Sequence, residues 1–216
     1  MQFEKGYIYH IYNQGNNRQQ IFFNRENYLY FLRKINAYIL PYADILSWCL
    51  MPNHFHLMVY VREEEIDASI WDVTQGSETH TIHQMTQSHL MDSMGKKRSL
   101  SNSIAIMLRS YTRAINKQNN QTGSLFRPHT KAECVNCPNG ITPNFINKQG
   151  GAQINISIPE REYPQICFDY IHKNPTRAKL VQRNEDWEFS SAQDYLGLRN
   201  GKLINKELAK EYVTIN

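Results

Sequence analysis

The first part of the chain alternates between strand-like and helix-like patterns of hydrophobic residues. Residues 7–13 are rich in aromatic and β-branched side chains and are followed by Gly15 and a polar loop, a pattern that predicts a strand. After Asn24, apolar residues recur at helical spacing until Pro41, which predicts a helix with Asn24 as its N-cap. A strand and an amphipathic helix are therefore expected to open the fold.

Two further strands and a second helix follow in the pattern. Residues 43–51 and 54–61 are largely apolar and flank a Pro-Asn pair that favours a tight turn, so they predict a hairpin. Residues 104–115 carry apolar side chains on one helical face, and residues 124–130 predict a fourth strand. The order β-α-β-β-α-β predicts an α+β fold of the ferredoxin-like type, with an antiparallel sheet, helices on one face and the other face free for a substrate.

Two polar stretches interrupt this pattern. Residues 62–102 include the segments EEE, QGSETHT and GKKRS, and residues 133–160 are rich in Asn and Gly, so we interpret both as insertions. A helical pattern resumes at Pro164 and predicts a C-terminal helix. The length of 216 residues favours one domain over residues 1–216 that contains both insertions.

Composition restricts the function only loosely. A formal charge of +4 and a pI of about 8.8 permit a polyanionic partner without requiring one. The sequence begins with no signal-peptide pattern, and no apolar run is long enough to span a bilayer, so we expect a cytoplasmic protein with no membrane partner.

The cysteines are too few and too unevenly spaced for a disulfide framework, so we expect reduced thiols. One CxxC pair offers an alternative, a structural zinc site, for which His129 or the group of His80, His83 and His89 could supply further ligands. The four cysteines are Cys49, Cys134, Cys137 and Cys167.

His54 and His56 form the first candidate for chemistry. They are two residues apart in a predicted strand, so both imidazoles project from the same face of the sheet. Neutral imidazole is a common ligand of divalent metals. Taken alone, the pair is equally well explained as two partly buried, hydrogen-bonded histidines.

Tyr170 and Asn174 form the second candidate. They are four residues apart and lie on one face of a helix, where a nucleophile and an oxygen ligand could meet the same metal. His172, between them, points elsewhere and is interpreted as structural. On its own, Tyr170 is better explained by packing than by nucleophilic attack, since the chain has 13 tyrosines, and Pro175 could end the helix at Asn174.

Four motifs in order resemble one family of proteins. The segment WCLMPNHFHLMV resembles the HUH segment of the REP-associated tyrosine transposases and the related single-tyrosine transposases of insertion sequences. The segments YHIYNQGNNRQQIF, NNQTGSLF and DYIHKNPTRAKLV, the last followed by DWEFSSAQDYLG, resemble the same family and together span most of the chain. Both polar stretches are longer than the compact pattern of that family.

The resemblance implies a reaction and assigns residues to it. It implies that His54, His56 and Asn174 bind Mg²⁺ or Mn²⁺ and that Tyr170 is the nucleophile. The implied reaction cleaves single-stranded DNA beside a hairpin, leaves a 5′-phosphotyrosine link and a free 3′-hydroxyl, and then transfers the strand. Relatives form homodimers that can exchange their tyrosine helices, so a homodimer is also implied.

Four basic residues flank these motifs and are candidates for phosphate contacts. They are Arg18, Arg127, Lys173 and Arg177. Two other functions remain open on the residues alone. One is a catalytically silent protein that binds hairpin or single-stranded nucleic acid. The other is a metal-dependent nuclease that uses water instead of a tyrosine.

Overall fold

A four-stranded antiparallel sheet forms the centre of the molecule. The structure, a computed structural model, describes residues 1–67, 96–137, 145–146, 152–153 and 163–215. The strands are β1 (Ile8–Gln14), β2 (Ala43–Met51), β3 (His54–Val61) and β6 (Lys131–Cys134). They are arranged in the order β2-β3-β1-β6, and every neighbouring pair is antiparallel. The bounds of β2 and β3 confirm the predicted hairpin.

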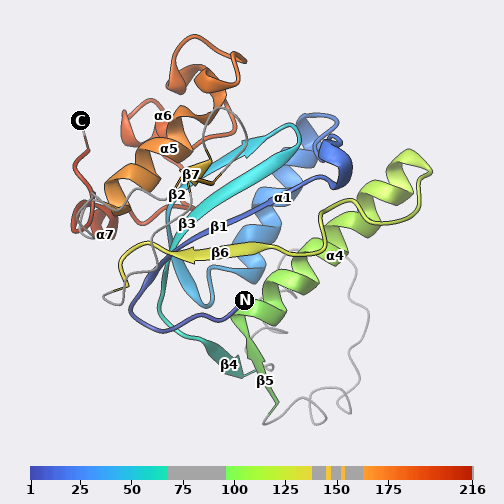
Figure 1. Cartoon of the computed structure of the whole chain (residues 1–216), viewed down its shortest axis with the longest axis horizontal. Coiled ribbons are helices and arrows are strands. Elements are labelled where there is room, and N and C mark those ends of the chain that lie inside the picture. The colour runs from blue at the N-terminus through green and yellow to red at the C-terminus, as the bar shows by residue number, and fades with distance from the viewer. Residues whose placement is uncertain (68–95, 138–144, 147–151, 154–162, 216) are drawn as a thin grey trace.

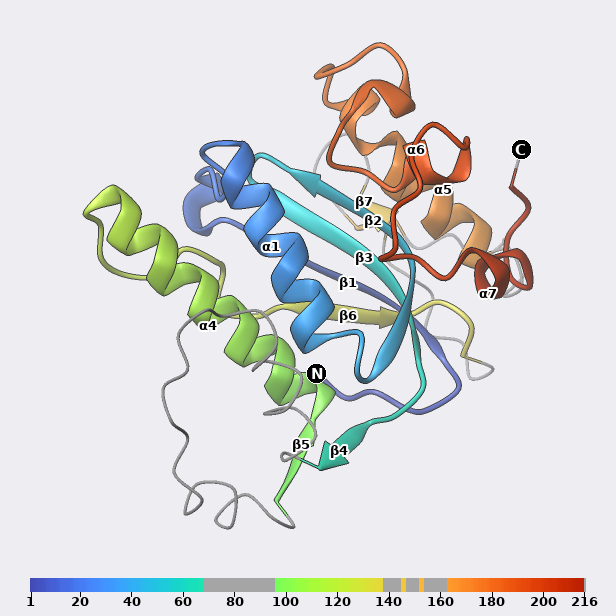
Figure 2. The ribbon, with the colours of Figure 1, turned by 180° about the vertical axis from the view of Figure 1, so that it is seen from behind.

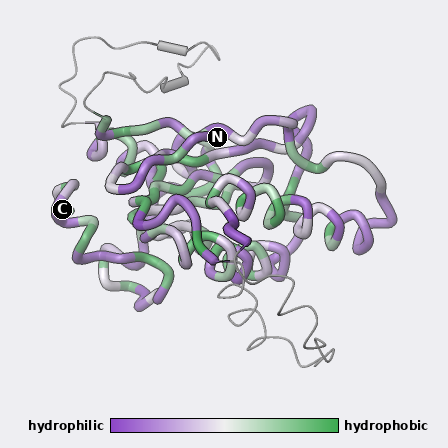
Figure 3. Tube along the Cα trace, turned by 90° about the horizontal axis from the view of Figure 1, so that it is seen from below, coloured by the Kyte–Doolittle hydropathy of each residue, from purple (hydrophilic) through white to green (hydrophobic). Residues whose placement is uncertain are grey.

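Helices α1 (Arg25–Tyr38) and α4 (Leu100–Asn119) cover one face of the sheet (Figures 1 and 2). The side chains of Asn24 and Ser99 cap these helices by accepting hydrogen bonds from backbone N–H groups. Alternate strand residues, such as Ile11 and Phe55, pack against the helices and are fully buried. Figure 3 shows the hydrophobic segments gathered in the middle of the molecule, where these layers meet.

The predicted fourth strand at residues 124–130 is wrong, because the strand begins later, at β6. Within the predicted range, only Phe126 forms a bridge, to Gly15. Pro128 has no N–H group to donate to a ladder, and the side chain of Asn13 donates to the backbone oxygen of Arg127 at 3.2 Å. Side chains thus hold this segment in an irregular conformation beside the end of β1.

The second face of the sheet is partly covered, which corrects the expectation that it would be free. Helix α5 (Tyr163–Arg177) packs over β2 and β3 through a second buried cluster. Pro175 lies inside this helix, which continues to Arg177 instead of ending at Asn174. The fully buried members of this cluster include Ile8, Leu46, Cys49, Met58, Cys167 and Ile171.

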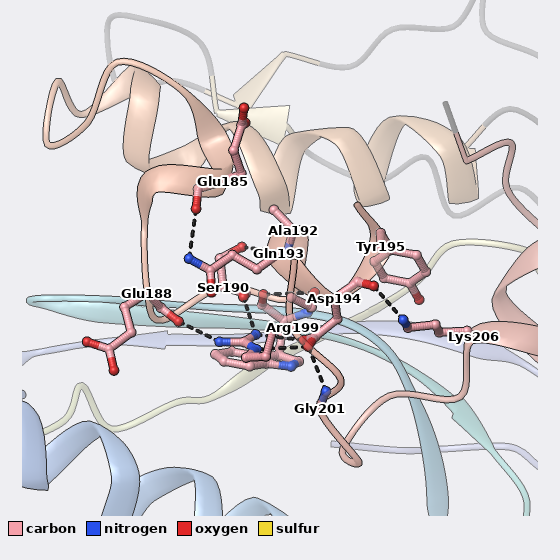
Figure 4. Close-up of polar contacts among 12 residues, drawn as sticks. Glu185, Glu188, Ser190, Ala192, Gln193, Asp194, Tyr195, Arg199, Gly201 and Lys206 are labelled. Atoms are coloured by element: carbon pink, nitrogen blue, oxygen red, sulfur yellow. Dashed lines mark hydrogen bonds and ion pairs between the residues drawn. The ribbon is translucent and has the colours of Figure 1, made fainter. Parts of the chain in front are cut away.

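The C-terminal segment is fixed to the edge strand β2. It contains the short helices η3 (Asn184–Asp186), α6 (Ala192–Tyr195) and α7 (Lys206–Lys210). The carboxylate of Asp194 is 1% exposed and accepts hydrogen bonds from Arg199 Nε at 2.8 Å and from the backbone N–H of Gly201 at 2.9 Å (Figure 4). Lys206 donates to the backbone oxygen of Asp194. We call these four residues the Asp194 cluster.

The two predicted insertions contain short elements. Within 62–102 are β4 (Glu65–Asp67), its partner β5 (Lys97–Ser99) and the start of α4, whereas 68–95 lie outside the described residues. Within 133–160 are the end of β6 and the paired β7 (Phe145–Ile146) and β8 (Ala152–Gln153). The 3-10 helix η1 (Asn16–Arg18) follows β1.

The expectation of four reduced thiols is also wrong. Cys134 and Cys137 are joined by a disulfide, because the turn after β6 brings their Cα atoms to 5.8 Å. Cys49 and Cys167 are free and buried. Among the helices of the described residues, none is both long and apolar enough to cross a membrane.

Candidate functional site

Three histidines and one tyrosine meet on the face of the sheet that carries α5. His54 and His56 project from β3, and their ring centroids lie 5.0 Å apart. Helix α5 places the ring of Tyr170 with its centroid 5.3 Å from that of His56. His10 projects from the neighbouring strand β1, with its ring centroid 5.0 Å from that of His56. The period-two geometry of two adjacent strands produces this group.

A buried hydrogen bond joins two of these imidazoles. His10 Nε2 and His56 Nδ1 lie 2.9 Å apart, and both residues are 4% exposed. Burial lowers the pKa of His10 to about 3 and that of His56 well below its ordinary value, so both rings are neutral near pH 7. One ring must therefore donate and the other accept. The remaining nitrogen, His56 Nε2, is buried and has no hydrogen-bond partner among the described residues.

Asn174 lies between the tyrosine and the other histidine. Its Nδ2 donates to the backbone oxygen of Tyr170 at 2.9 Å, which fixes the amide on the helix surface. Burial lowers the pKa of His54 to about 4, and a hydrogen bond with the Asn174 side chain opposes this shift. His54 Nδ1 also lies 2.6 Å from Asn53 Oδ1. The predicted residues His54, His56, Tyr170 and Asn174 are thus brought together.

The phenol of Tyr170 is partly shielded from water. Burial raises the pKa of this phenol, whereas a hydrogen bond with Asn174 and the positive charge of Arg177 act in the opposite direction. The Arg177 guanidinium carbon lies 5.4 Å from the centroid of the Tyr170 ring. The surroundings therefore contain two groups that favour the phenolate over the phenol.

A pocket of about 390 Å³ opens at this group of side chains. Two basic side chains, Arg127 and Lys131, reach it from the segment before β6 and from β6 itself. The volume and the positively charged lining suit a small anionic ligand. The full lining is Tyr12, Asn13, Gln14, His54, His56, Arg127, His129, Lys131 and Tyr170.

The four basic residues predicted to contact phosphates have different positions. Arg127 lines the pocket, and Arg177 lies over the Tyr170 ring. Arg18 is exposed beside the β2–β3 turn, where its backbone oxygen accepts from Asn53 Nδ2 at 3.3 Å. Lys173 forms an exposed ion pair with Asp169 at 2.8 Å and lines a different hollow from Tyr170. Lys173 is thus the one member of this set that is paired and placed away from the pocket.

The donor set has the chemistry to hold a divalent cation. Two neutral imidazoles and one amide oxygen can supply three ligands, and the unpaired His56 Nε2 is the polar atom that such an ion would satisfy. The described residues include no group of three or more His, Cys, Asp or Glu side chains that could hold a metal, so the set depends on the amide of Asn174. The alternative zinc site has lost its thiolates to the Cys134–Cys137 disulfide.

Sequence reasoning missed His10 and Lys131 and placed His172 correctly. His172 is buried, and its Nε2 lies 2.7 Å from Ser191 Oγ, away from the pocket. The signal for His10 is its spacing from Tyr12 in the first strand: residues two apart project from the same face, so His10 and Tyr12 share one face of the sheet. In the observed register, Tyr12 is opposite His56. A strand pair that places aromatic and imidazole rings on one face is a detectable signal.

Comparison with known proteins supports the fold alone. No family model matches the chain, and no curated protein sequence matches it. The fold is similar to the solved structure of a REP-associated tyrosine transposase bound to a REP hairpin, with a TM-score of 0.50 and 15% sequence identity. The similarity covers 91% of this chain and 83% of that chain. It therefore extends over most of this chain.

Proposed function

We propose that this protein cleaves single-stranded DNA beside a hairpin and transfers the cut strand through a covalent bond to Tyr170. The observation that carries the proposal is that Tyr170, His54 and His56 line one basic pocket, with His56 Nε2 left without a partner among the described residues. Asn174 adjoins this group through its hydrogen bonds with His54 and with the backbone of Tyr170. The proposal is also supported by the structurally similar transposase, which was solved with a hairpin bound. The sheet is then a ferredoxin-like platform, and α5 is the helix that carries the nucleophile.

Tyr170 performs the attack in this proposal. Its phenolic oxygen forms a bond to the phosphorus of a phosphodiester while the bond from phosphorus to the 3′-oxygen breaks. The phenolic proton leaves to solvent, and the departing 3′-oxygen takes up a proton, so the products are a 5′-phosphotyrosine and a 3′-hydroxyl. A second 3′-hydroxyl can reverse the step and join a new strand without an external energy source.

His54, His56 and Asn174 hold a divalent cation in this proposal. When bound, Mg²⁺ or Mn²⁺ neutralises negative charge on the phosphate and so lowers the barrier to attack. The hydrogen bond to His10 orients the His56 ring, and Asn174 couples the ligand set to the helix that carries Tyr170. Arg177 and the Asn174 amide favour the phenolate that attacks.

Arg127 and Lys131 line the pocket and are placed to bind phosphates on either side of the cut bond. Arg18, beside the turn that precedes His54, extends the positive surface. Lys173 contributes only if its ion pair with Asp169 opens. A homodimer stays a prediction. Tyr170 lies beside the histidines of its own chain, which is the arrangement that acts in cis.

Covalent trapping tests the proposal. Single-stranded hairpin oligonucleotides from the sequences that flank the gene are incubated with Mn²⁺, and products are separated on denaturing gels. The wild-type protein should form a metal-dependent adduct, and Tyr170→Phe, which lacks only the hydroxyl, should form none. His56→Ala should slow adduct formation by about 10³-fold, or about 4 kcal/mol of transition-state stabilisation.

Tyr212→Phe is the matched control, because Tyr212 packs beside Tyr60, outside the pocket, and should keep full activity. Binding of the hairpins without any adduct would instead indicate a nucleic-acid-binding protein that does not cut. Metal-dependent cleavage that survives Tyr170→Phe would indicate a nuclease that uses water. Either result contradicts the proposed role of Tyr170.

A further inference from the structure

The positive charge of the chain is concentrated in one segment. Residues 96–137 contain eight Lys and Arg side chains and one Glu, so the formal charge of this segment is +7. The rest of the chain contains 16 basic and 19 acidic side chains and carries a charge of −3. The modest total of +4 therefore conceals a strongly basic region.

Much of this charge lies on one side of α4. Arg109, Arg113 and Lys117 follow one another at intervals of four residues, so they form a single stripe on the helix. Helix α4 contains no acidic residue, and all three side chains are exposed. Like charges at this spacing cost a few tenths of a kcal/mol per pair. Of the ion pairs formed by the described residues, none includes a member of this stripe.

A groove of about 460 Å³ runs between this stripe and residues 123–130. Arg109 and Arg113 line one wall, and Ser124 and Arg127 line the other. Arg127 and Asn13 line both this groove and the pocket that contains Tyr170. The two hollows therefore adjoin at Arg127. Residues 120–130 lead from the end of α4 back to β6, the strand at this edge of the sheet (Figures 1 and 2).

The second wall of the groove is held in place by side chains. Gln19 Nε2 donates to the backbone oxygen of Leu125 at 3.0 Å, and Asn116 Nδ2 donates to that of Gly123 at 2.9 Å. The backbone N–H of Arg127 donates to the oxygen of Gln14 at 2.9 Å. This irregular segment is thus fixed at both ends, and Arg127 is positioned between the two hollows without a strand ladder.

We propose that the groove between α4 and residues 123–130 binds the phosphodiester backbone of the DNA whose strand reaches Tyr170. Arg109, Arg113 and Arg127 would each contact a phosphate, and the second N–H of the Asn116 side-chain amide would add a further contact. This inference rests on the proposed function, because it extends the same DNA path from the pocket around the sheet edge. Contacts of this kind set affinity and position but do not read the base sequence.

The test is the salt dependence of DNA binding by Arg109→Gln/Arg113→Gln. This double variant and the control described below are both made in a Tyr170→Phe background, so that binding is measured without cleavage. The probe is the same set of hairpin oligonucleotides. Removing two phosphate contacts should reduce the slope of log Kd against log salt by between about 1.4 and 2. Affinity near physiological salt should fall by about ten- to fiftyfold.

The matched control is Arg33→Gln/Lys202→Gln, which removes two charges from α1 and from the C-terminal segment, outside both hollows. This control should keep the wild-type slope. An equal loss in both double variants would show a general charge effect and would overturn the groove, as would no loss in either. Adduct formation is measured separately in the wild-type protein, which keeps Tyr170, Arg109 and Arg113. A normal wild-type adduct together with an unchanged slope in the double variant refutes the groove alone, whereas no adduct in the wild-type protein refutes the proposed function.

Discussion

Two buried polar clusters differ in whether all of their polar atoms have hydrogen-bond partners. In the Asp194 cluster, the carboxylate of Asp194 accepts from Arg199 and Gly201, and the Arg199 guanidinium also donates to the backbone oxygens of Glu188 and Ser190 (Figure 4). The Arg199 guanidinium carbon further lies 5.2 Å from the centroid of the Trp48 ring. Each buried polar atom of this carboxylate therefore has a partner.

The histidine cluster, which we define as His10, His54, His56, Tyr170 and Asn174, is buried to a similar degree but is incomplete. His56 Nε2 has no partner among the described residues, and the cluster opens to a pocket. An unsatisfied buried nitrogen costs about 1–3 kcal/mol, a cost that a fold tolerates where a ligand supplies the missing partner. Burial alone does not distinguish the two clusters, whereas the satisfaction of their polar atoms does.

Removing the Asp194 carboxylate should have the largest effect on stability. Asp194→Ala leaves Arg199, whose side chain is 30% exposed, without its ion-pair partner at 2.6 Å. We expect a loss of about 3 kcal/mol in the free energy of unfolding, measured by denaturant titration. Folded Asp194→Ala protein should still form the Tyr170 adduct, because the carboxylate takes no part in the chemistry.

Asp186→Ala is the control for this variant, since Asp186 forms an ion pair with Arg183 at 2.6 Å on the surface. Its unfolding free energy should be close to that of the wild type, because exposed ion pairs contribute little. Equal losses in the two variants would mean that the Asp194 cluster is no more important for stability than a surface ion pair. The hydrogen bonds of the Asp194 cluster would then not distinguish it in stability from an exposed ion pair.

Removing the His10 ring should affect metal binding more than folding. If His56 Nε2 binds a metal, its Nδ1 must carry the proton and donate to His10 Nε2, which lies 2.9 Å away. His10→Ala deletes this acceptor, and we expect Mn²⁺ affinity, measured by calorimetry, to fall by about 10- to 100-fold. His10→Gln should recover most of the loss, because its amide oxygen can accept the same hydrogen bond.

Nitrogen-15 NMR of the metal-free wild-type protein gives an independent measure, because it reports which ring nitrogen carries the proton. The proton is expected on His56 Nδ1. A proton on His56 Nε2, together with unchanged Mn²⁺ affinity in His10→Ala, would remove His10 from the site. A loss of affinity that His10→Gln does not recover would mean that the ring supports packing instead.

Much of the helical and strand pattern could be predicted from the sequence, because burial imposes strong periodicity. The bounds of β2 and β3 follow from two apolar runs around one turn, and the N-cap at Asn24 follows from its position before a helical stripe. The strand predicted at 124–130 failed because its neighbours are long-range. Asn13, which holds that segment in its irregular conformation, is more than a hundred residues away in the chain.

The candidate site was only partly predictable for the same reason. A two-residue spacing places His54 and His56 on one face, and a four-residue spacing places Tyr170 above Asn174, so each pair is local. The pairing of β1 with β3, which brings His10 to His56, depends on the register of the whole sheet. The disulfide of Cys134 with Cys137 and the covering of β2 by α5 likewise depend on tertiary packing.

The smallest expected effect is a difference in reactivity between two buried thiols, one on β2 and one on α5. Cys49 lies on β2 beneath the C-terminal segment, in a bridge with Ser190, and Cys167 lies on α5 one turn before Tyr170. Burial raises the pKa of both thiols, so the reactive thiolate forms only when the structure opens locally.

Alkylation followed by peptide mass spectrometry should modify Cys167 about tenfold faster than Cys49, because the helix that carries the incomplete cluster is expected to open more often. Mn²⁺ should slow the reaction of Cys167 and leave that of Cys49 unchanged, since a cation bound through Asn174 stabilises the closed position of α5. In the unfolded, unreduced control, only these two free thiols should react, because Cys134 and Cys137 are bonded. Equal rates that do not respond to Mn²⁺ would show that β2 and α5 open together, and that the missing partner of His56 does not weaken the fold locally.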